Sequence, residues 1–208
     1  MKKIPVLYTA KNSIYKQIKT ADPWDETRDA TKWPGGVPCI AHPPCRLWSI
    51  LRHLSTADPV ERYLGLIAVC QVRLNGGILE HPAYSTLWRA AQLPPPGGFP
   101  DEYGGYTIEI DQVKAGHRAR KRTWLYIVGA ENLPPLPTPE NRATHVLDTG
   151  KSIRHRAKLH VKTPLKRSLG KNARAATPEP FAHWLLSIAK TITPRNNNTQ
   201  DNTYKNTK

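Results

Sequence analysis

The sequence predicts one three-layer α/β domain with a mostly parallel sheet, a basic insertion and a helix near the C-terminus. Short apolar runs that end at Pro or Gly have the length and composition of buried strands. One segment between two such runs carries helix start and stop signals, and residues 181–192 hold apolar side chains at helical spacing. A length of 208 residues suits one domain of ordinary size with appendages.

Five segments are expected to form strands. The first two are residues 6–9 and 37–41; a loop or short helix at residues 11–19 and a stretch at 21–30, acidic within a basic chain, lie between them. The remaining three are residues 77–82, 106–110 and 122–128, of which 106–110 alternates between apolar and polar side chains as a half-buried strand does.

A helix is expected between the second and third strands. Asp58 can cap it, Pro59 suits its first position and Glu61 completes a capping-box pattern. Asn75 and the two glycines after it end it. A strand, a helix and a strand in succession form a crossover, so the strands on either side of this helix are predicted to be parallel.

The chain divides into a main domain at residues 1–139, a basic irregular segment at 140–176, a helix at 177–193 and a disordered tail at 194–208. Residues 142–174 hold ten Lys or Arg and one acid, with little apolar periodicity. The C-terminal helix is expected to pack on the core through an apolar stripe made of Phe181, Trp184, Leu185, Ile188 and Ile192.

The charge balance predicts a polyanionic partner. The chain has 31 Lys and Arg against 16 Asp and Glu, a formal net charge of +15, which favours DNA, with an anionic membrane surface as the alternative. No apolar stretch reaches the roughly 20 residues of a membrane span, and the N-terminus lacks a signal-peptide pattern. Three cysteines without framework spacing suggest reduced thiols, so we expect a cytoplasmic protein with no membrane association and no evident obligate protein partner.

A cysteine follows the second strand at the tip of a stiff turn. Two prolines end the strand, and Cys45 comes next, between His42 and Arg46. A thiol near cationic groups can have a lowered pKa and act as a nucleophile. The alternative is a structural cysteine beside a proline turn.

Two further loops carry ionisable side chains. Glu80 and His81 lie at the end of the third strand, and a basic turn precedes the last strand. The carboxyl ends of parallel strands meet at one edge, where ligands bind, so the cysteine turn and Glu80 should be neighbours. A metal site of a nuclease, built from Asp22, Asp25, His42, Glu80 and His81, is a weaker alternative because these spacings match no ligand motif. The basic turn comprises His117, Arg118, Arg120, Lys121 and Arg122.

In this order the three loops resemble motifs of the C5-cytosine DNA methyltransferases. Pro43-Pro44-Cys45 is similar to their Pro-Pro-Cys loop, Glu80-His81-Pro82 to their Glu-Asn-Val motif, and Arg118-Ala119-Arg120 to their Gln-x-Arg-x-Arg motif. Short phage-type proteins described as methyltransferase-like are more similar still, because they share an Ala-His-Pro-Pro-Cys turn and a Gly-His segment like that at 116–123. The resemblance covers roughly residues 6–129 and the closing helix, and it implies a Rossmann-like methyltransferase-type domain.

The resemblance also implies a mechanism. Cys45 would attack C6 of a flipped-out cytosine and leave a covalent adduct with a nucleophilic C5. Glu80 would hold the N3 and amino edge of the base, and Arg118 or Arg120 would contact the base carbonyl.

S-adenosylmethionine would then be the methyl donor, contacted by Thr9 and by Asp22 or Asp25. The chain departs from the family pattern here, because residues 8–13 after the first strand contain no glycine. We expect DNA contacts from a set of basic side chains, namely His42, Arg46, His81, His117, Lys121, Arg122, Arg154, Arg156, Lys158, Lys166 and Arg167.

The sequence therefore predicts DNA base modification by a C5-cytosine methyltransferase-like enzyme. One alternative is a non-catalytic DNA-binding or anti-restriction accessory protein of the same fold that lacks a donor site. Another is a different base modification that uses the same thiol adduct.

Overall fold

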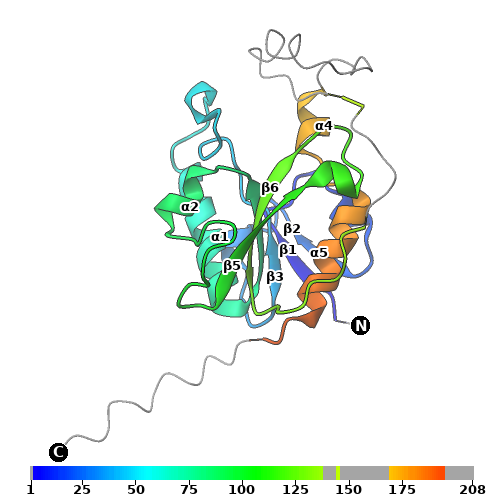
Figure 1. Ribbon diagram of the computed structural model, residues 1–208. Helices are drawn as coiled ribbons and strands as arrows, with labels where there is room; N and C mark the ends of the chain where they lie inside the picture. The colour runs from blue at the N-terminus through cyan, green and yellow to red at the C-terminus, as the bar shows by residue number, and fades with distance from the viewer. Residues whose placement is uncertain (1, 138–143, 146–168, 195–208) are drawn as a thin grey trace, which may run out of the picture.

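A computed structural model describes residues 2–137, 144–145 and 169–194 (Figure 1). These residues form a six-stranded sheet in the order β2-β1-β3-β4-β6-β5. The strands are β1 (Ile4–Leu7), β2 (Ala21–Trp24), β3 (Cys39–Ala41), β4 (Gly77–Pro82), β5 (Gly105–Asp111) and β6 (Arg122–Val128). The α-helices are α1 (Glu61–Asn75), α2 (Thr86–Ala90), α4 (Lys171–Ala175) and α5 (Glu179–Thr191). Short 3₁₀ helices are η1 (Ile14–Gln17), η2 (Ala30–Lys32), η3 (Arg52–Leu54) and η4 (Gln112–Ala115).

The sheet is mostly parallel, as predicted. Strands β2, β1, β3 and β4 run in one direction, while β6 lies antiparallel between β4 and β5. The expected crossover is confirmed, because β3 and β4 pair in parallel, with Ile40 opposite Ile78, and α1 connects them.

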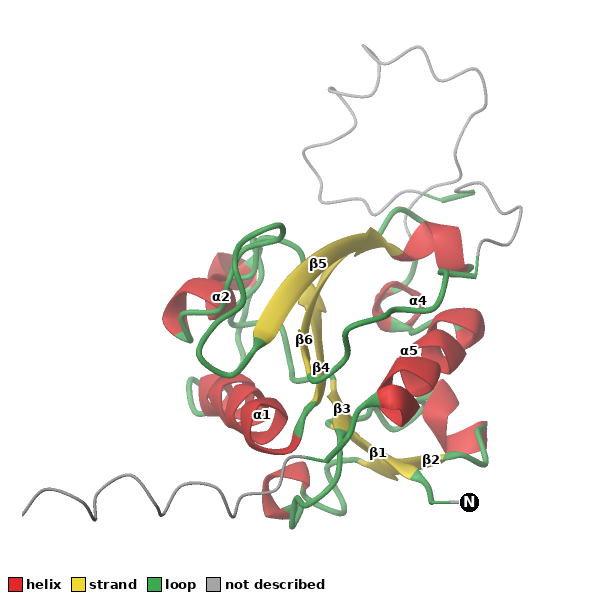
Figure 2. Ribbon diagram, turned by 60° about the horizontal axis from the view of Figure 1, so that its bottom comes forward, coloured by secondary structure: helices red, strands yellow, loops and turns green. Residues whose placement is uncertain are grey.

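Helices cover both faces, so the molecule has three layers. Figure 2 shows α1 and α2 on one side of the sheet and α5 on the other. Ile40 and Ile78 pack with α5, whereas the neighbouring Cys39 and Leu79 pack with α1, as the alternation of side chains along a strand requires. The apolar stripe of the C-terminal helix is buried in the first of these cores, which confirms its predicted docking.

The structure contains two elements that were not predicted from the sequence. The acidic stretch at 21–30 contains β2, an edge strand that tolerates Pro23 because it pairs on one side only. The segment 140–176, expected to be irregular, includes α4. Residues 146–168, and with them the predicted DNA contacts Arg154, Arg156, Lys158, Lys166 and Arg167, lie outside the described residues.

The chain leaves β1 toward β2 and then returns to β3 on the other side of β1. This reversal makes the carboxyl ends of β1 and β3 the switch point of the sheet, where open α/β sheets bind ligands. The main-chain N–H of His42 donates to the Leu7 carbonyl at 3.1 Å, so the turn after β3 starts against the end of β1. In the part of the chain that the structure describes, each helix is too short or too polar to cross a membrane.

Candidate functional site at the carboxyl edge of the sheet

Cys45 stands on the turn that follows β3. The Cys45 carbonyl accepts hydrogen bonds from the N–H groups of Trp48 at 3.0 Å and Ser49 at 2.8 Å, which fix the turn. Trp48 is 2 % exposed and packs with the α1 side of the core, so it serves the fold. Cys45 itself remains partly exposed at the edge of the sheet.

Glu80 is held at both carboxylate oxygens. Its Oε2 lies 3.0 Å from His42 Nδ1, and its Oε1 accepts a hydrogen bond from Gln112 Nε2 at 2.9 Å. The side chain is 11 % exposed, and this burial alone would raise its pKa. The His42 hydrogen bond and the positive charge of Lys121 outweigh burial and lower the pKa of Glu80 to about 2. Glu80 is therefore ionised at neutral pH.

The thiol is near these charges but is not activated by them. Burial raises the pKa of the Cys45 thiol, and the Glu80 carboxylate raises it further, while Lys121 and Arg46 oppose both effects. The lowered pKa expected from the neighbouring cations was therefore wrong. Arg46 directs its charge elsewhere, because its guanidinium donates to Glu61 at 2.7 Å.

His81 lies on the opposite face of β4 from Glu80. Its side chain is fully buried, and its ring centroid is 6.3 Å from that of Trp88 on α2. Burial lowers the pKa of His81 to about 4, although the Glu80 charge and the nearby Pro44 carbonyl oppose this change. His81 is therefore a neutral, buried side chain that the structure does not present to DNA.

Lys121 is the cation of the basic turn that approaches the site. Its charge acts on both Glu80 and Cys45, and its Nζ lies 3.3 Å from the Ala176 carbonyl, beside the end of α4. Arg120 instead pairs with Asp111 at 2.8 Å, with 74 % of its side chain exposed.

The other members of the basic turn are exposed, paired with another side chain, or buried. Arg118 is exposed, and Arg122 pairs with Glu109 on the surface at 2.6 Å. His117 is 4 % exposed and its Nδ1 lies 2.7 Å from the Ala119 carbonyl. Arg118 and Arg120, which were predicted to touch the base, are thus not among the groups that contact Glu80 or shift its pKa as described above.

Two contributors were missed by sequence reasoning. Gln112, in η4, is fully buried, and Tyr15, in η1, is 1 % exposed with its hydroxyl 3.1 Å from His42 Nε2. A signal was available for Gln112, since it lies two residues past the end of the strand expected at 106–110.

The residues predicted to contact a methyl donor are buried or engaged within the chain. Asp22 accepts from Arg28 at 2.7 Å, and Asp25 accepts from the Thr27 N–H at 3.0 Å, so both acids are engaged within the chain. Thr9 is buried, with an Oγ1 that has no hydrogen-bond partner. The centroid of the Tyr15 ring lies 5.3 Å from that of the His42 ring.

Apolar side chains are exposed between the cysteine turn and the first turn of α1. This apolar rim is drawn in blue to cyan in Figure 1 and projects above the sheet. It is fixed to the site by the Arg46–Glu61 ion pair and by Arg62, which stacks on Trp48 at 4.3 Å. Its members are Ile50, Leu51, Leu54, Val60 and Tyr63, between 38 % and 70 % exposed.

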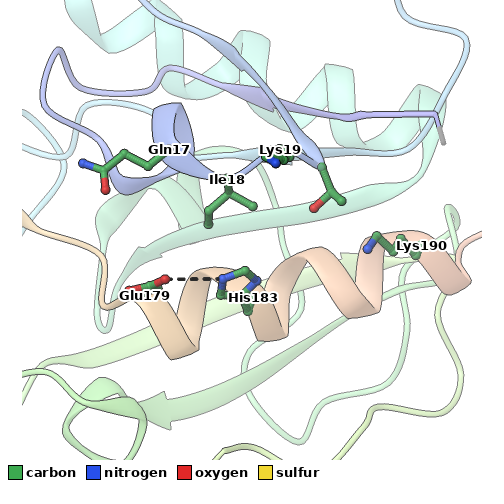
Figure 3. Close-up of a pocket in the computed structure, with 7 residues that line it drawn as sticks. Gln17, Ile18, Lys19, Glu179, His183 and Lys190 are labelled. Atoms are coloured by element: carbon green, nitrogen blue, oxygen red, sulfur yellow. Dashed lines mark ion pairs between the residues drawn. The ribbon is translucent and has the colours of Figure 1, made fainter.

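A shallow hollow of about 330 Å³ lies away from these residues, between the η1–β2 connection and α5 (Figure 3). Its lining includes Lys19, Glu179 and His183, with Glu179 and His183 3.7 Å apart, and none of the predicted site residues. Among the described residues, no group of three His, Cys, Asp or Glu side chains is arranged to hold a metal ion, so the alternative nuclease centre is not assembled.

Comparison with known proteins identifies no family for this sequence. No protein-family model matches the sequence, and no curated protein matches it significantly. The site therefore has to be interpreted from its own geometry.

Proposed function

We propose that this protein modifies DNA bases through a thiol adduct, in the manner of a C5-cytosine methyltransferase. Cys45 attacks C6 of a flipped cytosine, and Glu80 holds the N3 and amino edge of the base. The observation that carries the proposal is the meeting of three distant segments at one edge of the sheet. The thiol turn, the buried ionised Glu80 and Lys121 act on one another electrostatically there.

Thiol addition needs a bound cytosine, a nucleophile and a group that stabilises the charge that develops on the ring. The Cys45 sulfur bonds to C6 while the C5–C6 π pair moves to C5, and the thiol proton leaves to solvent. Ionised Glu80 favours the N3-protonated ring, which is the better acceptor. Lys121 takes the place that the resemblance gives to Arg118 or Arg120, because it is the cation near the thiol and the carboxylate. Formation of this adduct requires no methyl donor, and Asp22 and Asp25 are engaged in contacts within the chain.

The surface beside the site suits a base that leaves the duplex. Flipping a nucleotide costs a few kcal/mol of lost stacking and pairing. Proteins often offset this free-energy cost by inserting apolar side chains between base steps, while cationic side chains bind phosphates. The apolar rim lies beside Cys45, and Arg52 within it is exposed. A formal net charge of +15 supports the same partner.

The test uses duplex DNA carrying 5-azacytosine, whose ring nitrogen at position 5 takes a proton after thiol addition, so no methyl donor is required. We expect wild-type protein to form an adduct that survives denaturant and has the summed mass of protein and DNA. Cys45→Ser should form none. Cys70→Ser is the matched control, because Cys70 is an exposed thiol on α1. An adduct with Cys45→Ser, or none with wild type, contradicts the proposal.

The second candidate is a DNA-binding accessory protein without catalysis. Two observations favour it: the raised pKa of the Cys45 thiol and the engaged side chains of Asp22 and Asp25. Such a protein would bind DNA with a steep salt dependence and form no adduct. Calorimetric titration with S-adenosylmethionine tests the cofactor separately, and heat saturating at millimolar donor or below would show that a donor site exists.

A further inference from the structure

A chain of buried hydrogen bonds ends on Glu80 from one side. The Tyr15 hydroxyl lies 3.1 Å from His42 Nε2, and His42 Nδ1 lies 3.0 Å from Glu80 Oε2. All three side chains are on the α5 face of the sheet, and the His42 side chain is 12 % exposed. Burial raises the pKa of Tyr15, so its hydroxyl stays protonated and can donate to Nε2. His42 Nδ1 then carries the proton that Glu80 accepts.

A second buried chain ends on Glu80 from the other side. Gln112 Nε2 donates to Glu80 Oε1 at 2.9 Å and to Thr123 Oγ1 at 2.8 Å. The Thr123 hydroxyl in turn donates to the Lys121 carbonyl at 3.2 Å. This arrangement fixes the orientation of the amide, because an ionised carboxylate accepts only and would repel the amide oxygen. Gln112 Oε1 is left buried without a partner.

Together the two series of hydrogen bonds hold the Glu80 carboxylate in one orientation. Each carboxylate oxygen is held by one donor and keeps further lone pairs for a ligand. A carboxylate held in this way can meet the N3 and amino edge of a base without first losing rotational freedom. Other charged or titratable groups interact electrostatically with this network. Lys121, Cys45 and His81 interact with Glu80, and His81 also interacts with His42.

We propose that His42, fixed in its Nδ1–H form by Tyr15, is a positioning residue for Glu80, and that Gln112 is the second clamp on the same carboxylate. The inference rests on the proposed function, in which Glu80 contacts the base. It assigns His42 a role within the protein in place of the DNA contact expected from the sequence.

The kinetic test compares two replacements of His42 in the 5-azacytosine reaction. His42→Asn keeps an N–H donor near the position of Nδ1, whereas His42→Gln places it near Nε2. We expect His42→Asn to stay within a few-fold of wild type. His42→Gln should be slower by roughly ten- to a hundredfold, the value of a hydrogen bond to a charged group. His183→Gln, on the exposed side of α5, is the matched control.

The pH profile separates positioning from loss of structure. Without a donor at Nδ1, less opposes the effect of burial, and the pKa of Glu80 rises toward its ordinary value of 4.5 or above it. The His42→Gln rate should therefore fall more steeply at acid pH than the wild-type rate, because Glu80 is protonated in addition to the Cys45 thiol, which titrates in both proteins. Equal rates and profiles for His42→Asn and His42→Gln would overturn the proposal.

A measurement independent of activity keeps this inference distinct from the proposed function. Long-range ¹H–¹⁵N NMR of DNA-free wild type reports which His42 ring nitrogen carries a proton. A protonated Nδ1 supports the positioning role, and an unprotonated Nδ1 overturns it. If wild type forms no adduct, the proposed function fails, and the NMR result alone decides whether His42 positions Glu80.

Discussion

Replacing Glu80 by Gln should remove much of the acid sensitivity of the fold. The ordinary pKa of a glutamate is 4.5, and that of folded Glu80 is about 2. Because the unfolded chain binds this proton more tightly, the stabilisation is present above the unfolded value and is lost as pH falls toward the folded value. One pKa unit corresponds to about 1.4 kcal/mol, so ionised Glu80 contributes about 3 kcal/mol of unfolding free energy at neutral pH.

The assay is urea unfolding followed by tryptophan fluorescence at a series of pH values. Wild type should lose about 2 kcal/mol through Glu80 between neutral pH and about pH 3. Glu80→Gln should be less stable at neutral pH, and its curve should converge with that of wild type as pH falls. His81, whose pKa is lowered to about 4, adds an acid-dependent loss to both proteins.

The control is Glu102→Gln, which removes one exposed carboxylate from the same basic chain. It measures the general effect of adding net positive charge. A difference between wild type and Glu80→Gln that stays constant across the pH range would refute the reasoning, because it would mean that Glu80 has the same pKa in the folded and unfolded chains.

Three further predictions test the fold and the site. Gly77→Ala should lower the unfolding free energy by at least about 2 kcal/mol in urea titrations, because Gly77 has φ of +133° and an added Cβ would lie 2.0 Å from a main-chain oxygen of β3. Leu54→Ser should reduce the fluorescence rise of 2-aminopurine beside the target base, while Phe99→Ser, 94 % exposed and outside the apolar rim, should not. Lys121→Met should slow adduct formation by about tenfold or more, whereas Arg120→Met should leave the rate within about twofold; equal effects would contradict the assignment.

The parts of the fold that could be predicted have local signals. Within the β3–α1–β4 unit, two prolines follow the end of β3, and Asn75-Gly76-Gly77 lie at the junction of α1 and β4. Strand β2 carries no such signal, because Ala21–Trp24 includes an acid and a proline. Its strand conformation depends on pairing with β1, which only the folded chain supplies.

The site residues that lie at strand ends could be predicted from the sequence. Those contributed by other segments of the fold could not. Cys45 and Glu80 follow or end strands that the sequence identifies. Tyr15 reaches His42 from a 3₁₀ segment, and no spacing rule places it there.

The proposal of Lys121 in place of Arg118 or Arg120 has a geometric reason. Burial alternates along this extended stretch, with His117 and Ala119 inward and Arg118 and Arg120 outward. Lys121 therefore falls on the inward side. If His117 is placed in the interior, the alternation of side chains along an extended segment predicts that Lys121 also lies on the inward side.

Part of the rise in the pKa of the Cys45 thiol comes from the Glu80 carboxylate, so this part depends on whether a substrate neutralises that charge. Removing the Glu80 charge should lower the pKa of Cys45, while burial continues to raise it. A protonated cytosine bound to Glu80 would neutralise the same charge, so the thiol would become more nucleophilic when its substrate is seated. We therefore expect Glu80→Gln to speed alkylation of Cys45 by iodoacetamide at neutral pH, measured by peptide mass spectrometry. Exposed Cys70 is the internal reference. A rate at Cys45 that is unchanged relative to Cys70 would mean that Glu80 does not control the thiol.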